Sequence, residues 1–427
     1  MVLDRVQGAA LPDSAASQAV EQADLPCVFS DILDMGDEQA QCSQHSGLCR
    51  VPSVDLLILG TSCKDMSRAN PGSVRREAVL LQQSSKGGSA QTFRGFLKYL
   101  DVHKPPLVLF ENVDSMQDSK AGGQSNADIF QAEVSARGYE SQSVVLDACQ
   151  FGLPARRRRV YVLLIRVGGN PLMTFAGRPL HAVFTTFRSL LSGCLRKAPC
   201  ASQVLLPSDD LAVREELSAR QQKAEESAKK QGQREAGQSV GARWAEQHMQ
   251  YAENLKLRWG KAPRPELARN PWFQCLTERE KDALPLCQAA LPSSMFRDTS
   301  QSIGRINAST WSADAGAHVA PTILPKQCLW IELGENSRPM LGREALTMQG
   351  FPALPFLEVV EKSQHALLRS AACAPSESLM QDLAGNAMSL PVVLAMLQCG
   401  FAAATWSSCR APKAAGETPL SKDEARF

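Results

Sequence analysis

The chain has 427 residues, of which 44% are hydrophobic, and a formal net charge of +2. This length can bury the core of one large domain or two ordinary ones. The longest apolar runs, at 160–165 and 390–397, are far shorter than the about 20 residues that cross a bilayer. The N-terminus has no apolar signal core either, so we expect a soluble intracellular protein.

The 13 cysteines are scattered along the chain and odd in number, which favours reduced thiols over a disulfide scaffold. No two of them have the C-x-x-C spacing of a zinc ribbon. The one mixed cluster, Cys42, His45 and Cys49, supports zinc only weakly, and we predict no metal site.

From residue 27 to residue 166 short apolar runs alternate with longer amphipathic segments, as in successive strand and helix units of a parallel sheet. Apolar periodicity predicts helices at 91–102 and 128–137. The short runs predict strands at 27–32, 55–60, 106–110, 141–146 and 159–165. This part of the chain is therefore predicted to be an α/β domain.

The strand and helix alternation ends after residue 166. Segment 209–257 is rich in Ala, Glu, Gln, Lys and Arg, a composition that favours exposed helix. A strand is predicted again at 328–332, and 381–400 predicts a turn followed by an apolar helix. From residue 407 we expect a disordered tail.

A cysteine follows the predicted strand at 55–60, in the segment TSCKDMS at 61–67. The C-terminal edge of an open α/β sheet is where ligands bind. Cys63 can be a nucleophile there if positive charge or a helix N-terminus stabilises its thiolate. For Cys63 considered without the other motifs, an ordinary half-buried loop thiol is the favoured interpretation over a nucleophile.

Charged residues mark the ends of two further predicted strands. Glu111 begins the tripeptide Glu-Asn-Val at the end of the strand at 106–110, where burial would raise the pKa of its carboxyl. Taken alone this is a weak motif. The run Arg156-Arg157-Arg158-Arg159 immediately precedes a strand, and its alternative is a solvated basic turn.

Together these features resemble the cytosine C5 DNA methyltransferase family, in which a Cys loop, Glu-Asn-Val and Arg-x-Arg occur in this order. Residues 343–352, REALTMQGFP, resemble the penultimate motif of the family, and 385–388, GNAM, resemble its last. The resemblance covers most of 27–400. It implies a Rossmann-like, mostly parallel sheet of the class I methyltransferase type. It also implies DNA (cytosine-5-)-methyltransferase activity with S-adenosylmethionine as the methyl donor.

The resemblance also implies a division of the chain. Residues 27–166 would be the catalytic α/β domain, 167–299 an inserted target-recognition region, and 300–406 a return to the catalytic domain. A poorly matched segment, 1–26, would precede them, and the tail 407–427 would follow. Trp244, Trp259 and Trp272 in the insertion could stack on bases, although helix-spaced tryptophans are more often core.

In the implied mechanism the thiolate of Cys63 adds to C6 of cytosine, and the base must first rotate out of the duplex. Glu111 would contact N3 and the exocyclic amine, while Arg157 and Arg159 would hold the base carbonyl and the carboxylate. The resemblance implies further substrate contacts from Asn112, Lys64 and Ser67. The implied donor contacts are Asp31, Ser62, Thr92, Phe93, Asn386 and Ala387.

The chain departs from the family pattern at three places. The glycine-rich donor loop that opens the family is not visible before Cys27, so we expect a sequence that is N-terminally incomplete. Ser62-Cys63-Lys64 stands where the family usually has Pro-Cys-Gln, and the missing proline would loosen the nucleophile loop. Ala155 stands where the motif with the two arginines usually begins with Gln.

Other functions stay open. Some proteins with this motif set act on tRNA, and the missing donor loop is also consistent with a non-catalytic nucleic-acid-binding remnant. A third alternative is an unrelated α/β protein with chance matches. We expect DNA as the partner, no membrane association, and a nuclear location that follows only from a DNA substrate.

Overall fold

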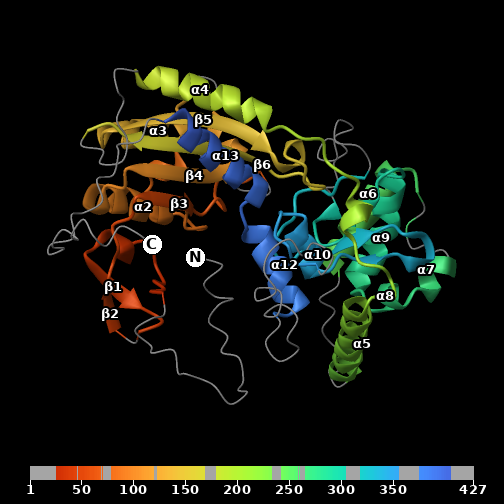
Figure 1. Ribbon diagram of the computed structural model, residues 1–427. Helices are drawn as coiled ribbons and strands as arrows, with labels where there is room; N and C mark the ends of the chain where they lie inside the picture. Colours follow the sequence, from red (N-terminus) through yellow and green to blue (C-terminus); the bar gives the residue numbers. More distant parts are fainter. Residues whose placement is uncertain are drawn as a thin grey trace, which may run out of the picture.

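Figure 1 shows a computed structural model of the chain, with a β-sheet and its covering helices beside a mainly helical region. The structure describes residues 26–404 apart from 46, 69, 71–77, 120–122, 169–178, 233–241, 258, 260–264, 304–317 and 355–374. The predictions made for 1–25 and for the tail from 407 lie outside the described residues.

Four strands form the main sheet: β3 (Leu56–Gly60), β4 (Leu107–Val113), β5 (Tyr139–Asp147) and β6 (Arg158–Arg166). Their order is β3-β4-β6-β5, with β3 and β4 parallel. β6 pairs antiparallel with both β4 and β5. β3, β4 and β5 therefore run in one direction, which agrees with the predicted mostly parallel sheet, and β6 alone is reversed.

Two helices cover each face of the sheet. Successive side chains of a strand point to opposite faces, so a central strand packs against the helices on both sides. Val108 and Phe110 of β4 pack with α2 (Ser89–His103) and α3 (Asn126–Ala136). Leu107 and Leu109 of the same strand pack toward α4 (Leu180–Gly193) and α13 (Leu390–Ala403). The two central strands, β4 and β6, are buried on both faces, which explains why they are almost continuously apolar in sequence.

The predicted strand at 27–32 is wrong. Among the described residues this segment forms only an isolated bridge, Phe29 with Cys42, before the 3₁₀ helix η2 (Asp34–Gly36). Its apolar residues reflect packing and not pairing, because Phe29 lies in a small core cluster with Tyr99 of α2. The sequence did not predict the antiparallel hairpin that follows, β1 (Gln39–Cys42) and β2 (Gly47–Arg50). β1 alternates exposed glutamines with the short buried residues Ala40 and Cys42, whereas Leu48 of β2 is exposed.

The segment after β6 is mainly helical. The predicted exposed helix at 209–257 is present as α5 (Leu211–Gly232) and α6 (Ala242–Asn254). Three further helices follow: α7 (Pro265–Arg269), α8 (Pro271–Gln274) and α9 (Glu278–Ala290). A three-stranded antiparallel sheet consists of β7 (Phe296–Asp298), β8 (Leu329–Ile331) and β9 (Arg338–Pro339), and β8 confirms the strand predicted at 328–332.

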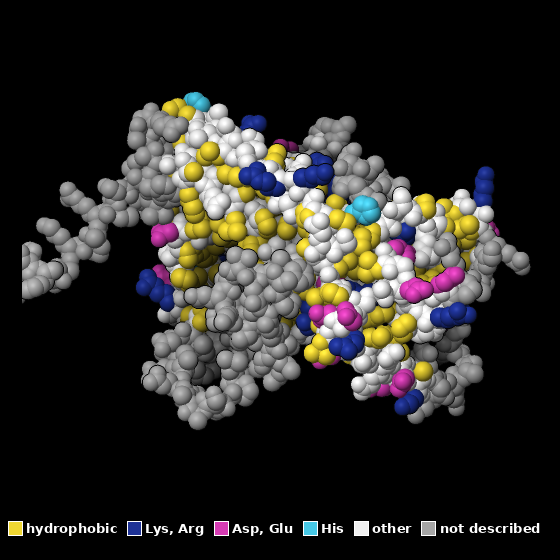
Figure 2. All heavy atoms as spheres, turned by 45° about the vertical axis from the view of Figure 1, so that its right-hand side comes forward, with side chains coloured by type: hydrophobic (Ala, Val, Ile, Leu, Met, Phe, Trp, Pro, Cys, Tyr) yellow, Lys and Arg dark blue, Asp and Glu magenta, His cyan; other side chains and the backbone are white. Residues whose placement is uncertain are grey.

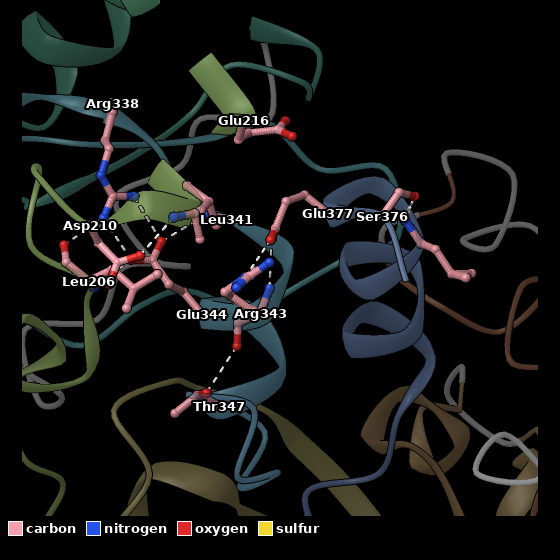
Figure 3. A network of polar contacts seen from close by, with 12 residues as sticks. Leu206, Asp210, Glu216, Arg338, Leu341, Arg343, Glu344, Thr347, Ser376 and Glu377 are labelled. Carbon is pink, nitrogen blue, oxygen red and sulfur yellow. Dashed lines mark hydrogen bonds and ion pairs between the residues drawn. The ribbon is translucent and has the colours of Figure 1, made fainter. Parts of the chain in front are cut away.

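A buried polar network joins the helical region to the C-terminal helices (Figure 3). Both Glu344 of α10 (Gly342–Thr347) and its partner Arg338 have fully buried side chains, and two Arg338 nitrogens lie 2.7 and 2.8 Å from the Glu344 carboxylate. Glu344 also accepts a hydrogen bond from the backbone N–H of Leu206 at 2.8 Å. Arg343 pairs with Glu377 of α12 (Glu377–Asn386), so α10 is fixed on both sides.

Helices α12 and α13 together span 27 residues and are long and apolar enough to cross a membrane by length and composition. Half of the most apolar 18-residue stretch of this segment is buried inside the protein. Val392, Met396 and Cys399 of α13 belong to the core cluster on the sheet. α13 is thus a core helix of this fold.

Candidate active site

The ends of two parallel strands bring the predicted chemical groups to one edge of the sheet. Gly60, the last residue of β3, is in register with Glu111 of β4, and Cys63 follows Gly60 in the loop. A Cβ atom built on Gly60 would lie 3.2 Å from Glu111 Oε2 and 3.3 Å from Met388 Cε. The loop that resembles the last family motif therefore lies against the same edge.

The cysteine loop is held by the start of helix α2. The Ser62 backbone N–H donates to Thr92 Oγ1 at 3.0 Å, and the Ser62 hydroxyl donates to the Gly87 carbonyl at 2.7 Å. The Cys63 carbonyl accepts the N–H groups of Met66 and Ser67 at 3.0 and 2.8 Å, which closes a tight turn after the thiol. Ser62 and Thr92, both predicted to bind the donor, thus meet in the structure.

Asp65 is a positioning residue that sequence reasoning missed. Its side chain is buried, and its carboxylate oxygens accept the N–H groups of Gly87 at 2.8 Å and Ser89 at 3.1 Å. Burial opposes ionisation, but hydrogen bonds from Ser85, Ser89 and Gly87 lower the pKa of the Asp65 carboxyl overall. Gly87 must be glycine here, since a Cβ would lie 2.6 Å from Lys64 Cβ. An acidic residue two positions after the cysteine was the available signal.

Glu111 and the two predicted arginines lie together. Arg159 Nε lies 3.3 Å from Glu111 Oε1, with 13% and 11% of the two side chains exposed. Arg157 is almost fully buried, and its guanidinium donates to the carbonyl oxygens of Ile323 and Gly385 at 3.4 Å. Arg157 thereby joins the catalytic edge to the end of α12.

These charges act on the thiol of Cys63. Burial raises the pKa of Cys63 and the carboxylate of Glu111 raises it further, while the positive charges of Arg159 and Arg157 lower it, with a net rise. Burial and the neighbouring Arg159 also lower the pKa of Arg157, to about 10. The site as a whole therefore disfavours the Cys63 thiolate relative to an ordinary cysteine, and the two arginines limit that effect.

The three predicted substrate contacts occupy different positions. The Asn112 amide is buried; it donates to Thr61 Oγ1 at 3.0 Å and accepts the Val113 N–H at 2.8 Å, so it ties β4 to the cysteine loop. Lys64 is exposed, and Ser67 lies in the turn after the thiol. Contact of Asn112, Lys64 and Ser67 with substrate stays a prediction.

The remaining residues predicted to bind the methyl donor lie in different environments. Asp31 is exposed, and its Oδ1 accepts the Leu33 N–H at 2.9 Å. Asn386 is also exposed, whereas Ala387 is buried. The Phe93 ring is 1% exposed and packs against Phe96 and Phe130 in the core. Phe93 can support the donor site only through its backbone or by positioning its neighbours.

The tryptophans of the insertion also differ in environment. Trp272 is buried in the core of the helical region, beneath the guanidinium of Arg220. Trp259 is 37% exposed and donates from Nε1 to Asp282 at 3.0 Å. On the face shown in Figure 2 the described Lys and Arg side chains form small separate groups. Because its side chain is exposed and that of Trp272 is buried, Trp259 is a better candidate than Trp272 for contact with a base.

Comparison with known proteins assigns these features to a family. The model of the C-5 cytosine-specific DNA methylases matches residues 28–395, which include Cys63, Glu111, the arginine run and the loop at 385–388. The chain belongs to this family. The sequence-based recognition of the cytosine C5 methyltransferases is therefore confirmed.

Two curated members of the family illustrate the likeness. The chain is 26% identical over 388 residues to the DNA (cytosine-5-)-methyltransferase DMT5 of Cryptococcus neoformans var. grubii, a match that covers 86% of the chain and 14% of DMT5. It is 26% identical over 156 residues to the type II methyltransferase M.NlaX of Neisseria lactamica, covering 34% of the chain and 46% of that protein. The chain thus spans less than half of the length of either relative.

Among solved structures, Dnmt2 methyltransferase of S. pombe matches with 14% identity and a TM-score of 0.35, over 82% of the chain and 77% of Dnmt2. The fold assignment rests on the strand order and the family match and not on this superposition.

Proposed function

We propose that the chain carries the catalytic centre of an S-adenosylmethionine-dependent DNA (cytosine-5-)-methyltransferase, with Cys63 as the nucleophile. The observation that carries this proposal is the grouping of Cys63, Glu111 and Arg159 at the C-terminal edge of β3 and β4. A thiol, a carboxyl and a paired guanidinium are the groups that covalent attack on a cytosine ring requires.

The chemistry follows from the poor reactivity of C5 in cytosine. The Cys63 thiolate donates an electron pair to C6, so that an Sγ–C6 bond forms, the C5–C6 π bond breaks, and its electrons make C5 the nucleophilic carbon of an enamine-like system with C4. Glu111 contacts N3 and accepts a hydrogen bond from the exocyclic amine, which supports the charge that develops on the ring. Arg159 orients Glu111 through the 3.3 Å contact and reaches the base carbonyl.

The donor supplies a methyl group to C5 as an electrophile. The C5 proton then leaves to a base, and elimination of Cys63 restores the C5–C6 double bond and the thiolate. For each methyl group that reaches C5, one proton leaves C5, the donor would leave as the neutral thioether S-adenosylhomocysteine, and the Cys63 thiolate is regenerated.

The described residues fit part of a donor site. Asp31 presents an exposed carboxylate in which only one oxygen accepts a hydrogen bond from the described chain, which suits the exocyclic amine of adenine. Segment 31–32 packs on α2, since a Cβ on Gly95 would lie 2.9 Å from the backbone of Ile32. α2 also holds Thr92, so Asp31, Thr92 and Ser62 share one support. Asn386 and Ala387 would close the opposite side.

The insertion at 167–299 is proposed to contact the DNA target and to offset the roughly few kcal/mol that base rotation costs. DNA as substrate also implies action in the nucleus. Both proposals rest on the family to which the chain belongs and on its similarity to the DNA (cytosine-5-)-methyltransferase DMT5.

Transfer of labelled methyl groups from S-adenosylmethionine tests the function, with duplex DNA and tRNA as separate acceptors. We expect transfer to cytosine C5 of DNA by the unchanged chain and none by Cys63→Ala. Cys399→Ala is the matched control, because Cys399 lies on α13 in the core beneath the sheet, outside both the catalytic edge and the insertion, and the variant should retain activity. Transfer by Cys63→Ala would overturn the mechanism, and transfer to tRNA alone would overturn the substrate.

A further inference from the structure

A cluster of three cysteines and one histidine lies away from the catalytic edge, at the tip of the β1–β2 hairpin. Cys42 ends β1, His45 lies in the hairpin turn and Cys49 lies on β2. Cys27, distant in sequence, joins them because the Ser43 N–H donates to the Val28 carbonyl at 2.8 Å and Phe29 bridges to Cys42. The fold thus supplies the fourth member that the sequence pattern did not show.

The four side chains converge on one point. His45 Nδ1 lies 3.5 Å from Cys27 Sγ, 3.4 Å from Cys42 Sγ and 3.4 Å from Cys49 Sγ. All four ligand atoms lie within 4.8 Å of one another. In a tetrahedral zinc site with Zn–S near 2.3 Å and Zn–N near 2.0 Å, a nitrogen and a sulfur ligand are about 3.5 Å apart. The three nitrogen–sulfur distances match that edge.

We propose that Cys27, Cys42, His45 and Cys49 bind one structural zinc ion. Three thiolates and one imidazole form a closed tetrahedral set of the type that structural zinc prefers, with no position left for water or substrate. Backbone N–H groups of Gln44 and His45 hydrogen-bond the Cys42 sulfur, as expected for a tight turn around a metal-bound thiolate.

The hairpin needs such a centre because its own core is small. β1 and β2 have four residues each, and an isolated two-stranded hairpin is at best marginally stable. Among the described residues the hairpin contributes to a small apolar cluster that includes Phe29, Val51 and Tyr99, where the Tyr99 hydroxyl donates to the Pro52 carbonyl at 2.7 Å. Figure 1 places the hairpin beside α2 and β3, at the end of the sheet. Zinc would supply the stability that burial does not.

The centre also has a consequence for the donor site, which rests on the proposed function. Cys27 begins the segment that leads to Asp31, so zinc would hold that segment on α2. Metal content is measured without any donor or DNA. The zinc proposal can therefore be disproved while methyl transfer is observed, and zinc can be found in a chain that transfers no methyl group.

Metal analysis of the whole purified chain, produced with added zinc and without chelators, tests the proposal. We expect about one zinc per chain, lost in Cys42→Ala and in His45→Ala. His45→Cys should retain it, because a fourth thiolate is also a zinc ligand. Cys200→Ala is the control, since Cys200 lies outside the cluster next to Ser202.

Replacement of zinc by Co²⁺ gives a second readout that does not depend on the stability of the variants. Tetrahedral thiolate ligands should produce intense visible absorption and charge-transfer bands in the unchanged chain and in His45→Cys, and removal of the metal should lower the melting temperature. A folded, unchanged chain without zinc, one that holds iron instead, or variants at Cys42 and His45 that keep their zinc would each overturn the proposal.

Discussion

Arg159 Nε lies 3.3 Å from Glu111 Oε1 across two antiparallel strands, and both side chains are nearly buried. The pair places one positive charge where it can act on Glu111 and on Cys63 together. Because a buried charge without its partner is costly, the two residues depend on each other for their position. In the proposed mechanism, Arg159 on β6 therefore controls the reactivity of the Cys63 thiol.

Replacement of Arg159 by Leu should lower kcat for methyl transfer by about 100-fold, the size expected when a preorganised charged donor is removed from a reacting centre. The change removes a positive charge that lowers the pKa of Cys63 and frees Glu111. Arg158→Leu is the matched control, because 62% of its side chain is exposed. Steady-state kinetics that show equal losses in the two variants would contradict the role of Arg159.

The pH dependence of methyl transfer should follow the thiol of Cys63. Burial and Glu111 hold its pKa above the ordinary value, so the thiolate fraction rises as pH rises. We expect kcat to increase from about pH 7 to about pH 9, by up to tenfold per pH unit. In Arg159→Leu the pKa rises further, and the profile should shift to higher pH. A rate that falls over this range would contradict Cys63 as the titrating nucleophile.

Asp65→Ala should reduce kcat without weakening DNA binding. The change removes the acceptor for the N–H groups of Gly87 and Ser89, and the cysteine loop then loses its support on α2. Gly87→Ala should have a similar effect. The added Cβ would lie 2.6 Å from Lys64 Cβ, so the cysteine loop that contains Lys64 would have to move away from Gly87. Filter binding of DNA and single-turnover methyl transfer separate the two steps. Unchanged single-turnover rates in both variants would show that this support is dispensable.

Glu344→Ala should destabilise the chain by about 3 to 5 kcal/mol, since it leaves the buried Arg338 without its partner. The double variant Arg338→Met with Glu344→Leu should lose much less, because no uncompensated charge remains. Denaturant unfolding measures both. A double variant as unstable as the single one would show that the hydrogen bonds to Leu206, and not the charge, dominate this network.

The sequence predicted the chemical groups better than their supports. Cys63, Glu111 and the arginines were found because they follow or precede strands whose continuous apolar runs are easily recognised. Asp65 and Gly87 were missed as supports because their roles depend on a contact between two loops that no periodicity marks. The sequence also did not predict that β6 runs antiparallel to its neighbours, because the direction of a strand depends on the connection that precedes it and not on its own residues.

The hairpin shows the same limit. Cys42, His45 and Cys49 were visible as a cluster in the sequence, but three ligands did not justify a metal site. Cys27 joins them only through the bridge between Phe29 and Cys42, a contact between segments that sequence spacing does not reveal. The misplaced strand at 27–32 hid that contact, because an extended strand there would have carried Cys27 into the main sheet.

The central claim is that Cys63 attacks C6 of cytosine, and covalent trapping tests it most directly. Duplex DNA in which 5-fluorocytosine replaces the target base blocks the last step, because fluorine cannot leave C5 as the proton does. With S-adenosylmethionine present, we expect a denaturation-resistant complex in which mass spectrometry places the nucleotide on the peptide that contains Cys63. A complex that forms equally well with Cys63→Ser, or an adduct located on another cysteine, would contradict the account.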